Sequence, residues 1–162
     1  MRWLITLFVL TLLPVSAGAD CVDPPGPGVE WTRCYFDERE FRGVDLTGAA
    51  MKDATFSRGD LSGATLANAN APRSKFISAT LTGADFSGAR LREADFTNAD
   101  LTDASFAGAD LRRARLFRAN LRGADFTKAR MRGADLLEAD LSGALWIDGK
   151  RRCAEGSLGQ CR

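Results

Sequence analysis

A five-residue period dominates this sequence. Every fifth residue from Leu81 to Leu141 is Leu, Phe or Met, and an alanine stands two positions before each of these central residues, from Ala79 to Ala139. The residue between the alanine and the centre is often Asp or Asn, and glycine often follows the centre by two positions, as in the block ADFSG at 84–88. The chain must therefore fold so that every fifth side chain meets the same environment.

Neither common element buries a pattern with this period. In an α-helix, five residues advance about 500°, so successive centres would lie about 140° apart and form no stripe. On a single strand, an odd spacing would place alternate centres on opposite faces. The pattern is instead typical of a coil that turns a corner once per block, with the centre and the preceding small residue inside. Four blocks close a turn of 20 residues, and successive turns stack by strand-like hydrogen bonds at about 4.8 Å.

These tandem blocks resemble those of the pentapeptide-repeat family, and the match covers residues 39–143. The resemblance implies an all-β chain folded as a right-handed quadrilateral parallel β-helix. At 20 residues a turn, the matched stretch would make about five turns. The period alone predicts a solenoid, and the hand and the square section come from the resemblance.

The N-terminal stretch, residues 1–19, reads as a targeting segment. A basic start at Arg2, an apolar run over 3–13 and small residues at 17–19 are typical of a secretory signal peptide, with Asp20 as the first mature residue. The alternative is an N-terminal membrane anchor, but the apolar run is shorter than the roughly 20 residues that span a bilayer. We therefore expect a periplasmic or secreted protein with no membrane span in its mature form.

The four cysteines lie in the two flanks, residues 20–38 and 144–162. About five turns at about 4.8 Å place the two ends of the repeat region more than about 20 Å apart, whereas a disulfide needs Cα atoms within about 7 Å. The pairs Cys21–Cys34 and Cys153–Cys161 are therefore predicted within one chain. Zinc binding is the weaker alternative, because the sequence has no histidine and exported cysteines usually pair.

We expect both flanks to close the ends of the column. Trp31 and Trp146 continue the five-residue phase, and a stacked column needs caps over its apolar end layers. Neither cysteine pair has the C-x-x-C spacing of a redox motif, so the capping role is favoured over thiol chemistry. The flanks also resemble the ends of exported bacterial pentapeptide-repeat proteins.

Residues 20 apart share a wall of the predicted coil, and one wall is rich in arginine. If residues 1–19 are removed, Arg2 is lost and basic and acidic residues become equal in number, so net charge favours no nucleic acid or anionic surface. The charge is nevertheless uneven, because Arg92, Arg112 and Arg132 fall directly above one another. This candidate anion-binding ladder also includes Arg113 and Arg130. The alternative is an ordinary solvated face that Glu93 and Asp110 partly neutralise.

A second candidate surface is apolar. Ile77, Phe117 and Leu137 fall one position after their centres, where side chains point outward, and they share one vertical file. Exposed apolar patches commonly mark interfaces. Side-to-side contact through this file and end-to-end homodimerisation through Trp146 are both open, since the family tends to dimerise end to end.

Catalysis finds no support in the sequence. There is no histidine, one tyrosine, and no nucleophile with a paired base, so we expect no enzyme, no cofactor and no catalytic or metal site. The resemblance raises one further role, since some family members mimic DNA and bind topoisomerases, but a neutral exported chain with a basic wall argues against it. The sequence favours a structural or protein-interaction scaffold with an unidentified protein partner, and an anion-binding module is the alternative.

Overall fold

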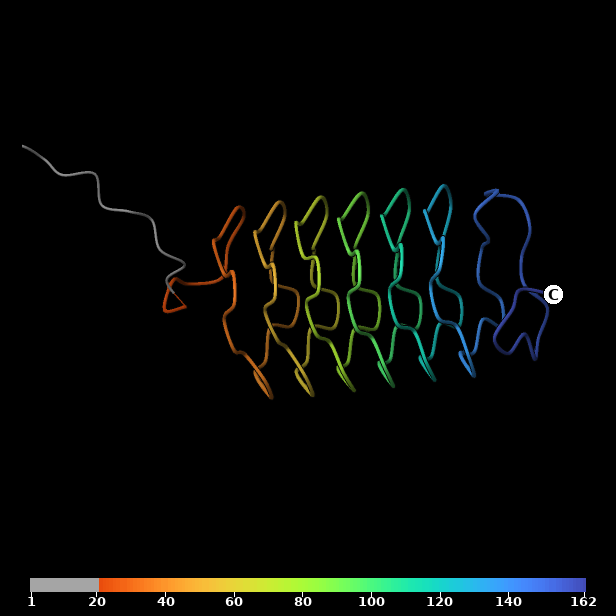
Figure 1. Cartoon of the computed structure of the whole chain (residues 1–162), viewed down its shortest axis with the longest axis horizontal. Coiled ribbons are helices and arrows are strands. Elements are labelled where there is room, and N and C mark those ends of the chain that lie inside the picture. The colour runs from red at the N-terminus through yellow and green to blue at the C-terminus, as the bar shows by residue number, and fades with distance from the viewer. Residues whose placement is uncertain (1–20) are drawn as a thin grey trace, which may run out of the picture.

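The computed structural model describes residues 21–162, which form a column of stacked coils with the C-terminus at one end (Figure 1). The signal peptide predicted for 1–19, with mature start near Asp20, lies outside the described residues. Within 21–162 there is no helix and no extended strand, so no element bounds arise beyond single-residue bridges. No segment of this range forms a helix that could cross a membrane.

Parallel bridges between residues 20 apart hold the coils together. Four files of bridges run along the column, and they begin at Glu30, Tyr35, Glu40 and Asp45. Each coil thus has four sides, which confirms the predicted 20-residue turn. The bridging extends beyond 39–143 at both ends, because Glu30 already pairs with Ala50 and Leu145 pairs with Asp125.

Nearly every backbone N–H of a block is paired by the same rule. In the block centred on Leu111, the N–H groups of Leu111 and Arg113 donate to the next coil, at Arg130 O (2.9 Å) and Arg132 O (3.2 Å). The N–H of Asp110 donates backward to Ala89 O at 2.9 Å, and the N–H of Ala114 closes a turn onto Leu111 O at 3.0 Å. The coil therefore satisfies its backbone polar groups without regular strands.

In each five-residue block, the residue two positions after the centre adopts a left-handed conformation whatever its side chain. Glycine holds this position in many blocks, as at Gly83 with φ of 65°, but Arg113 and Glu138 each adopt a φ of 60° in the same place. A non-glycine residue at positive φ costs roughly 1–2 kcal/mol. Because fourteen non-glycine residues accept this conformation, the stacking of the coils dictates the backbone more strongly than local preference does.

The core is a narrow apolar column of the central residues and their alanines. Phenylalanine rings stack along two opposite sides, for example Phe76 on Phe96 with centroids 5.0 Å apart and Phe86 on Phe106 at 5.2 Å. The two stacks meet edge to face across the axis, with Phe86 and Phe96 at 5.6 Å. These side chains are fully buried, and this packing gives the column its rigidity.

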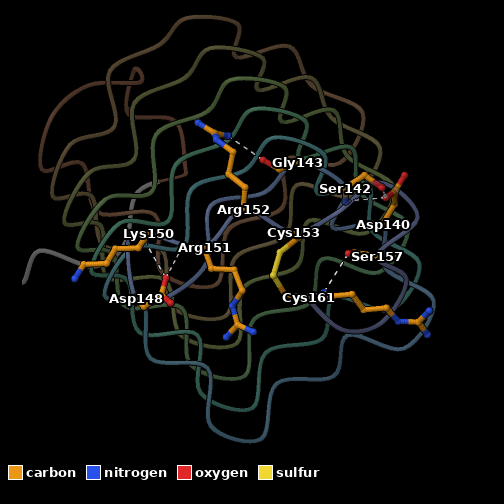
Figure 2. Close-up of a disulfide and its surroundings, with 11 residues drawn as sticks. Asp140, Ser142, Gly143, Asp148, Lys150, Arg151, Arg152, Cys153, Ser157 and Cys161 are labelled. Atoms are coloured by element: carbon orange, nitrogen blue, oxygen red, sulfur yellow. Dashed lines mark hydrogen bonds between the residues drawn. A yellow bond between two sulfur atoms is a disulfide. The ribbon is translucent and has the colours of Figure 1, made fainter.

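Both predicted disulfides are confirmed, at Cys21–Cys34 and Cys153–Cys161. At the N-terminal end, Trp31 is 1% exposed, packs 4.4 Å from the Phe36 ring and donates its indole N–H to Asp23 O at 3.3 Å. At the other end, Cys153 is buried and Trp146 is half-buried, edge to face with Phe126 at 5.9 Å. Seen along the column, the Cys153–Cys161 bond lies inside the outline of the coil (Figure 2).

Candidate functional site

The predicted arginine ladder surrounds one open hollow on the column wall. Arg92, Arg112, Arg113 and Arg132 line this hollow together with Gly133, and its volume is about 330 Å³. Backbone hydrogen bonds between coils fix the relative positions of these arginines, because the N–H of Glu93 donates to Arg112 O (3.1 Å) and that of Arg113 donates to Arg132 O (3.2 Å). We call this site the arginine hollow. The fifth predicted residue, Arg130, is exposed and is not among its lining residues.

The carboxylate of Asp110 holds the middle arginine in place. Arg112 Nε donates to Asp110 Oδ1 at 2.7 Å and Nη2 donates to Oδ2 at 2.5 Å, a bidentate pair. The hydrogen bond from Arg112 lowers the pKa of the Asp110 carboxyl, against the effect of burial. The carboxylate therefore stays charged near neutral pH and orients the guanidinium.

Arg113 is held more loosely. Its Nη1 lies 3.8 Å from Glu93 Oε1, and both side chains are substantially exposed. Within residues 21–162, the side chains of Arg92 and Arg132 have no carboxylate within ion-pairing distance. The sequence predicted the stacking of these arginines, but it did not distinguish the held residue from the unpaired ones.

The apolar candidate residues do not form one patch. Leu137 is 61% exposed, whereas Ile77 and Phe117 are half-buried, and Thr97 separates these two in the file. The Arg118 guanidinium covers part of Phe117, with its carbon 4.8 Å from the ring centroid. Trp146 lies ten residues beyond Leu136, on the opposite wall, and packs against the core. Phe117 and Leu137 remain neighbours on adjacent coils, linked through the hydrogen bond from Arg118 N to Leu137 O at 3.0 Å.

Other exposed apolar side chains lie in the flanks. Tyr35 is 80% exposed, Leu158 is 58% exposed and Ile147 is 41% exposed. Leu158 bridges antiparallel to Asp140, which places it beside the last coil. Its neighbours follow no five-residue period, so no sequence signal assigned it a position. Within the described residues, no cluster of His, Cys, Asp or Glu is arranged to hold a metal ion.

Repeated blocks, four bridges a turn and a continuous apolar axis define a four-sided parallel β-helix built from short repeats. Family models agree with this class. The model described as "Pentapeptide repeat region" matches residues 49–126, and that described as "Pentapeptide repeats (8 copies)" matches residues 114–145. Together these matches cover more than half of the chain, and the chain belongs to the pentapeptide-repeat family. This family forms right-handed quadrilateral β-helices.

Solved structures show the same likeness. A pentapeptide repeat protein (Rfr23) from the cyanobacterium Cyanothece 51142 is 25% identical, with a TM-score of 0.52 over 72% of this chain and 90% of that one. One from the thylakoid lumen of Arabidopsis thaliana is 26% identical, with a TM-score of 0.46 over 75% and 83%. QnrB1, a plasmid-mediated fluoroquinolone resistance protein, is 24% identical, with a TM-score of 0.45 over 72% and 61%. A comparison with curated proteins gives no match.

Proposed function

We propose that this chain is an exported bacterial scaffold, without enzymatic activity, that presents the walls of its β-helix to a protein partner. Pentapeptide-repeat proteins are generally structural or interaction proteins rather than enzymes. The observation that carries the proposal is the outward pair of Phe117 and Leu137 on adjacent coils of one wall. A rigid column keeps such side chains at fixed spacing, and exposed apolar groups on a rigid support are typical of interfaces.

Export is supported by the sequence of residues 1–19 and by the two disulfides, since disulfides persist in oxidising compartments. We infer a periplasmic location and a mature chain that begins at Asp20. Fractionation of the native host, with N-terminal sequencing of the purified protein, tests both inferences. Recovery of the protein in the cytosol with Met1 intact would refute export and would also reopen the DNA-mimic role.

The domain plan follows from the same proposal. After the signal peptide (1–19), residues 20–38 and 144–162 serve as disulfide-bonded caps for a right-handed β-helix of about five turns at 39–143. Homodimerisation through the C-terminal end or the apolar file belongs to this plan as a subsidiary proposal. Sedimentation at high protein concentration checks it, and a monomer throughout would remove it.

The partner proposal is tested by photo-crosslinking in living cells of the native host. A photo-reactive residue is placed at Phe117, and its adducts are identified by mass spectrometry. The matched control is Ala107, which holds the corresponding outward position ten residues away on the opposite wall. We expect one heterologous protein attached through position 117 and not through position 107. Equal labelling at both positions, or no adduct at either, would overturn the proposed surface.

A further inference from the structure

The arginine hollow carries more positive charge than its neighbouring carboxylates neutralise. Four guanidinium groups line it, and two carboxylates, Asp110 and Glu93, contact two of them. The hollow and its immediate partners therefore carry two uncompensated positive charges. These belong to the lining residues Arg92 and Arg132, which lie two coils apart in one file, about 10 Å along the column axis.

The neighbouring file of turn residues alternates in charge. It runs Arg33, Asp53, Arg73, Glu93, Arg113, so that opposite charges alternate from coil to coil. The Arg73–Asp53 pair is bidentate, with nitrogen–oxygen distances of 2.8 and 2.9 Å. The alternation predicts an acidic residue at the next position. Glycine stands there instead, so Arg113 has no carboxylate above it.

Gly133 also creates the space of the hollow. A Cβ atom at this position would lie 3.6 Å from Arg113 Cγ, so any longer side chain would extend over Arg113. The backbone does not require glycine, because Glu93 and Arg113 hold the same place in their turns with φ of 60°. The missing side chain therefore leaves a cavity beside Arg113, and no second carboxylate stands there to balance the unpaired Arg132.

We propose that the arginine hollow binds the dianionic phosphoryl group of a phosphomonoester. Guanidinium forks match the oxygen geometry of phosphate and form bidentate hydrogen bonds with it. A phosphomonoester carries about −1.5 to −2 charge at neutral pH, which balances the two uncompensated charges, whereas a carboxylate or a phosphodiester supplies only one. The pair with Asp110 presents Arg112 in a fixed orientation between the two unpaired arginines, which reduces the ordering cost of binding.

Isothermal titration calorimetry of the disulfide-bonded chain with glycerol 3-phosphate tests the proposal at pH 7.5 and low salt. Dimethyl phosphate is the comparison ligand, because it has the same phosphorus centre and a single charge. We expect glycerol 3-phosphate to bind at least about tenfold more tightly, a difference of about 1.4 kcal/mol. Equal affinity for the two ligands would overturn the assignment to a dianion.

Two pairs of variants locate the site. Arg132→Gln should weaken glycerol 3-phosphate binding about tenfold or more, because it removes a charge-assisted hydrogen bond. Arg33→Gln removes the same charge about 24 Å away along the column, beyond the screening length of about 10 Å, and should change nothing. Gly133→Glu should abolish binding by filling the hollow. Gly83→Glu is its control, because Gly83 has the same turn position and a similar φ of 65°, with open space around it on the opposite wall.

The phosphoryl group could belong to a small metabolite or to a lipid headgroup, and a vesicle arm separates these sources. Phosphatidylcholine vesicles with and without phosphatidic acid are sedimented with the wild-type chain and with Arg132→Gln. Binding of glycerol 3-phosphate supports a small ligand. Binding only to phosphatidic acid vesicles, and its loss in Arg132→Gln, supports a headgroup. Binding of neither probe, or unchanged binding in Gly133→Glu, would overturn the site.

Discussion

The two halves of the last coil differ in how their edges are completed. On the walls of Leu141 and Trp146 the C-terminal segment turns back antiparallel, so that Leu141 N donates to Ser157 O (2.9 Å) and Trp146 N to Arg151 O (2.8 Å). On the walls of Met131 and Leu136 the segment supplies no such cover. Within residues 21–162, the N–H groups of these two residues have no hydrogen-bond partner.

Burial follows the same division for the leucine and methionine centres, while Trp146 is half-buried in the covered half. Leu141 is fully buried in the covered half, whereas Met131 and Leu136 in the open half are only partly buried. The exposed Leu137 also belongs to the open half. A solenoid must protect its end from edge-to-edge association, and this chain does so on two of its four walls. The comparison shows that a cap can act wall by wall rather than as a lid over the whole end.

Hydrogen exchange should give the largest contrast between the two halves. The amides of Leu141 and Gly143 should exchange slower by about 10³-fold or more than those of Met131 and Leu136, because paired amides in the packed coil open only with several kcal/mol of unfolding. Exchange followed by NMR at single residues checks this. Slow exchange at Met131 and Leu136 would mean that another chain covers the open half in solution.

Truncating two leucines of one file should show how much less unfolding free energy a side chain at the open edge contributes than one in the interior. Leu116→Ala, in a fully buried position, should cost about 2–5 kcal/mol of unfolding free energy through lost burial and a cavity. Leu136→Ala, one coil later and partly exposed, should cost less than half of that. Urea denaturation measures both. Equal costs, or a cost for Leu136→Ala that grows with protein concentration, would contradict an open edge.

Loss of the C-terminal disulfide should weaken the covered half. Cys153 and Cys161 are separated by 8 residues, so removing their bond by Cys153→Ser with Cys161→Ser should cost about 2 kcal/mol or more. The amides of Leu141 and Gly143 should then exchange faster, while those near Trp31 stay protected. The control is Cys21→Ser with Cys34→Ser, which should reverse this pattern. Uniform loss of protection in either variant would indicate that the column unfolds as one unit.

The sequence was sufficient for the features that repeat. The five-residue period predicted the 20-residue coil and the buried centres such as Leu111. It also predicted that Arg92, Arg112 and Arg132 stack in one file. The end-to-end distance of the coil predicted both cysteine pairs. These predictions succeeded because each residue in a solenoid contacts only its own coil and the next one.

The features that break the repeat were beyond pattern analysis. Residues 147–162 have no period, so their antiparallel return onto Leu141 depends on which backbone groups the last coil leaves unpaired. The pairing of Arg112 with Asp110, and the space above Arg113, depend on side-chain direction and on one glycine. Trp146, in contrast, keeps the five-residue phase, and its central position places this predicted interface residue partly in the core.

A carboxylate in the covered half should give the smallest effect, and one that depends on pH. Burial raises the pKa of the Asp140 carboxyl, but hydrogen bonds from Ser142 and Arg122 outweigh it and leave the pKa below its ordinary value. A lowered folded-state pKa adds stability that is fully present above the unfolded pKa of about 3.9 and is lost as the pH falls through the folded value.

Asp140→Asn should therefore cost about 1 kcal/mol or less at pH 7, since the site is partly solvated. In urea denaturation at several pH values this cost should begin to shrink below about pH 4 and should vanish as the pH falls through the lowered folded-state pKa, where the folded carboxyl loses its charge. A cost that stays constant down to pH 2 would mean that the Asp140 side chain supports the covered half through its shape and neutral hydrogen bonds, and not through its charge.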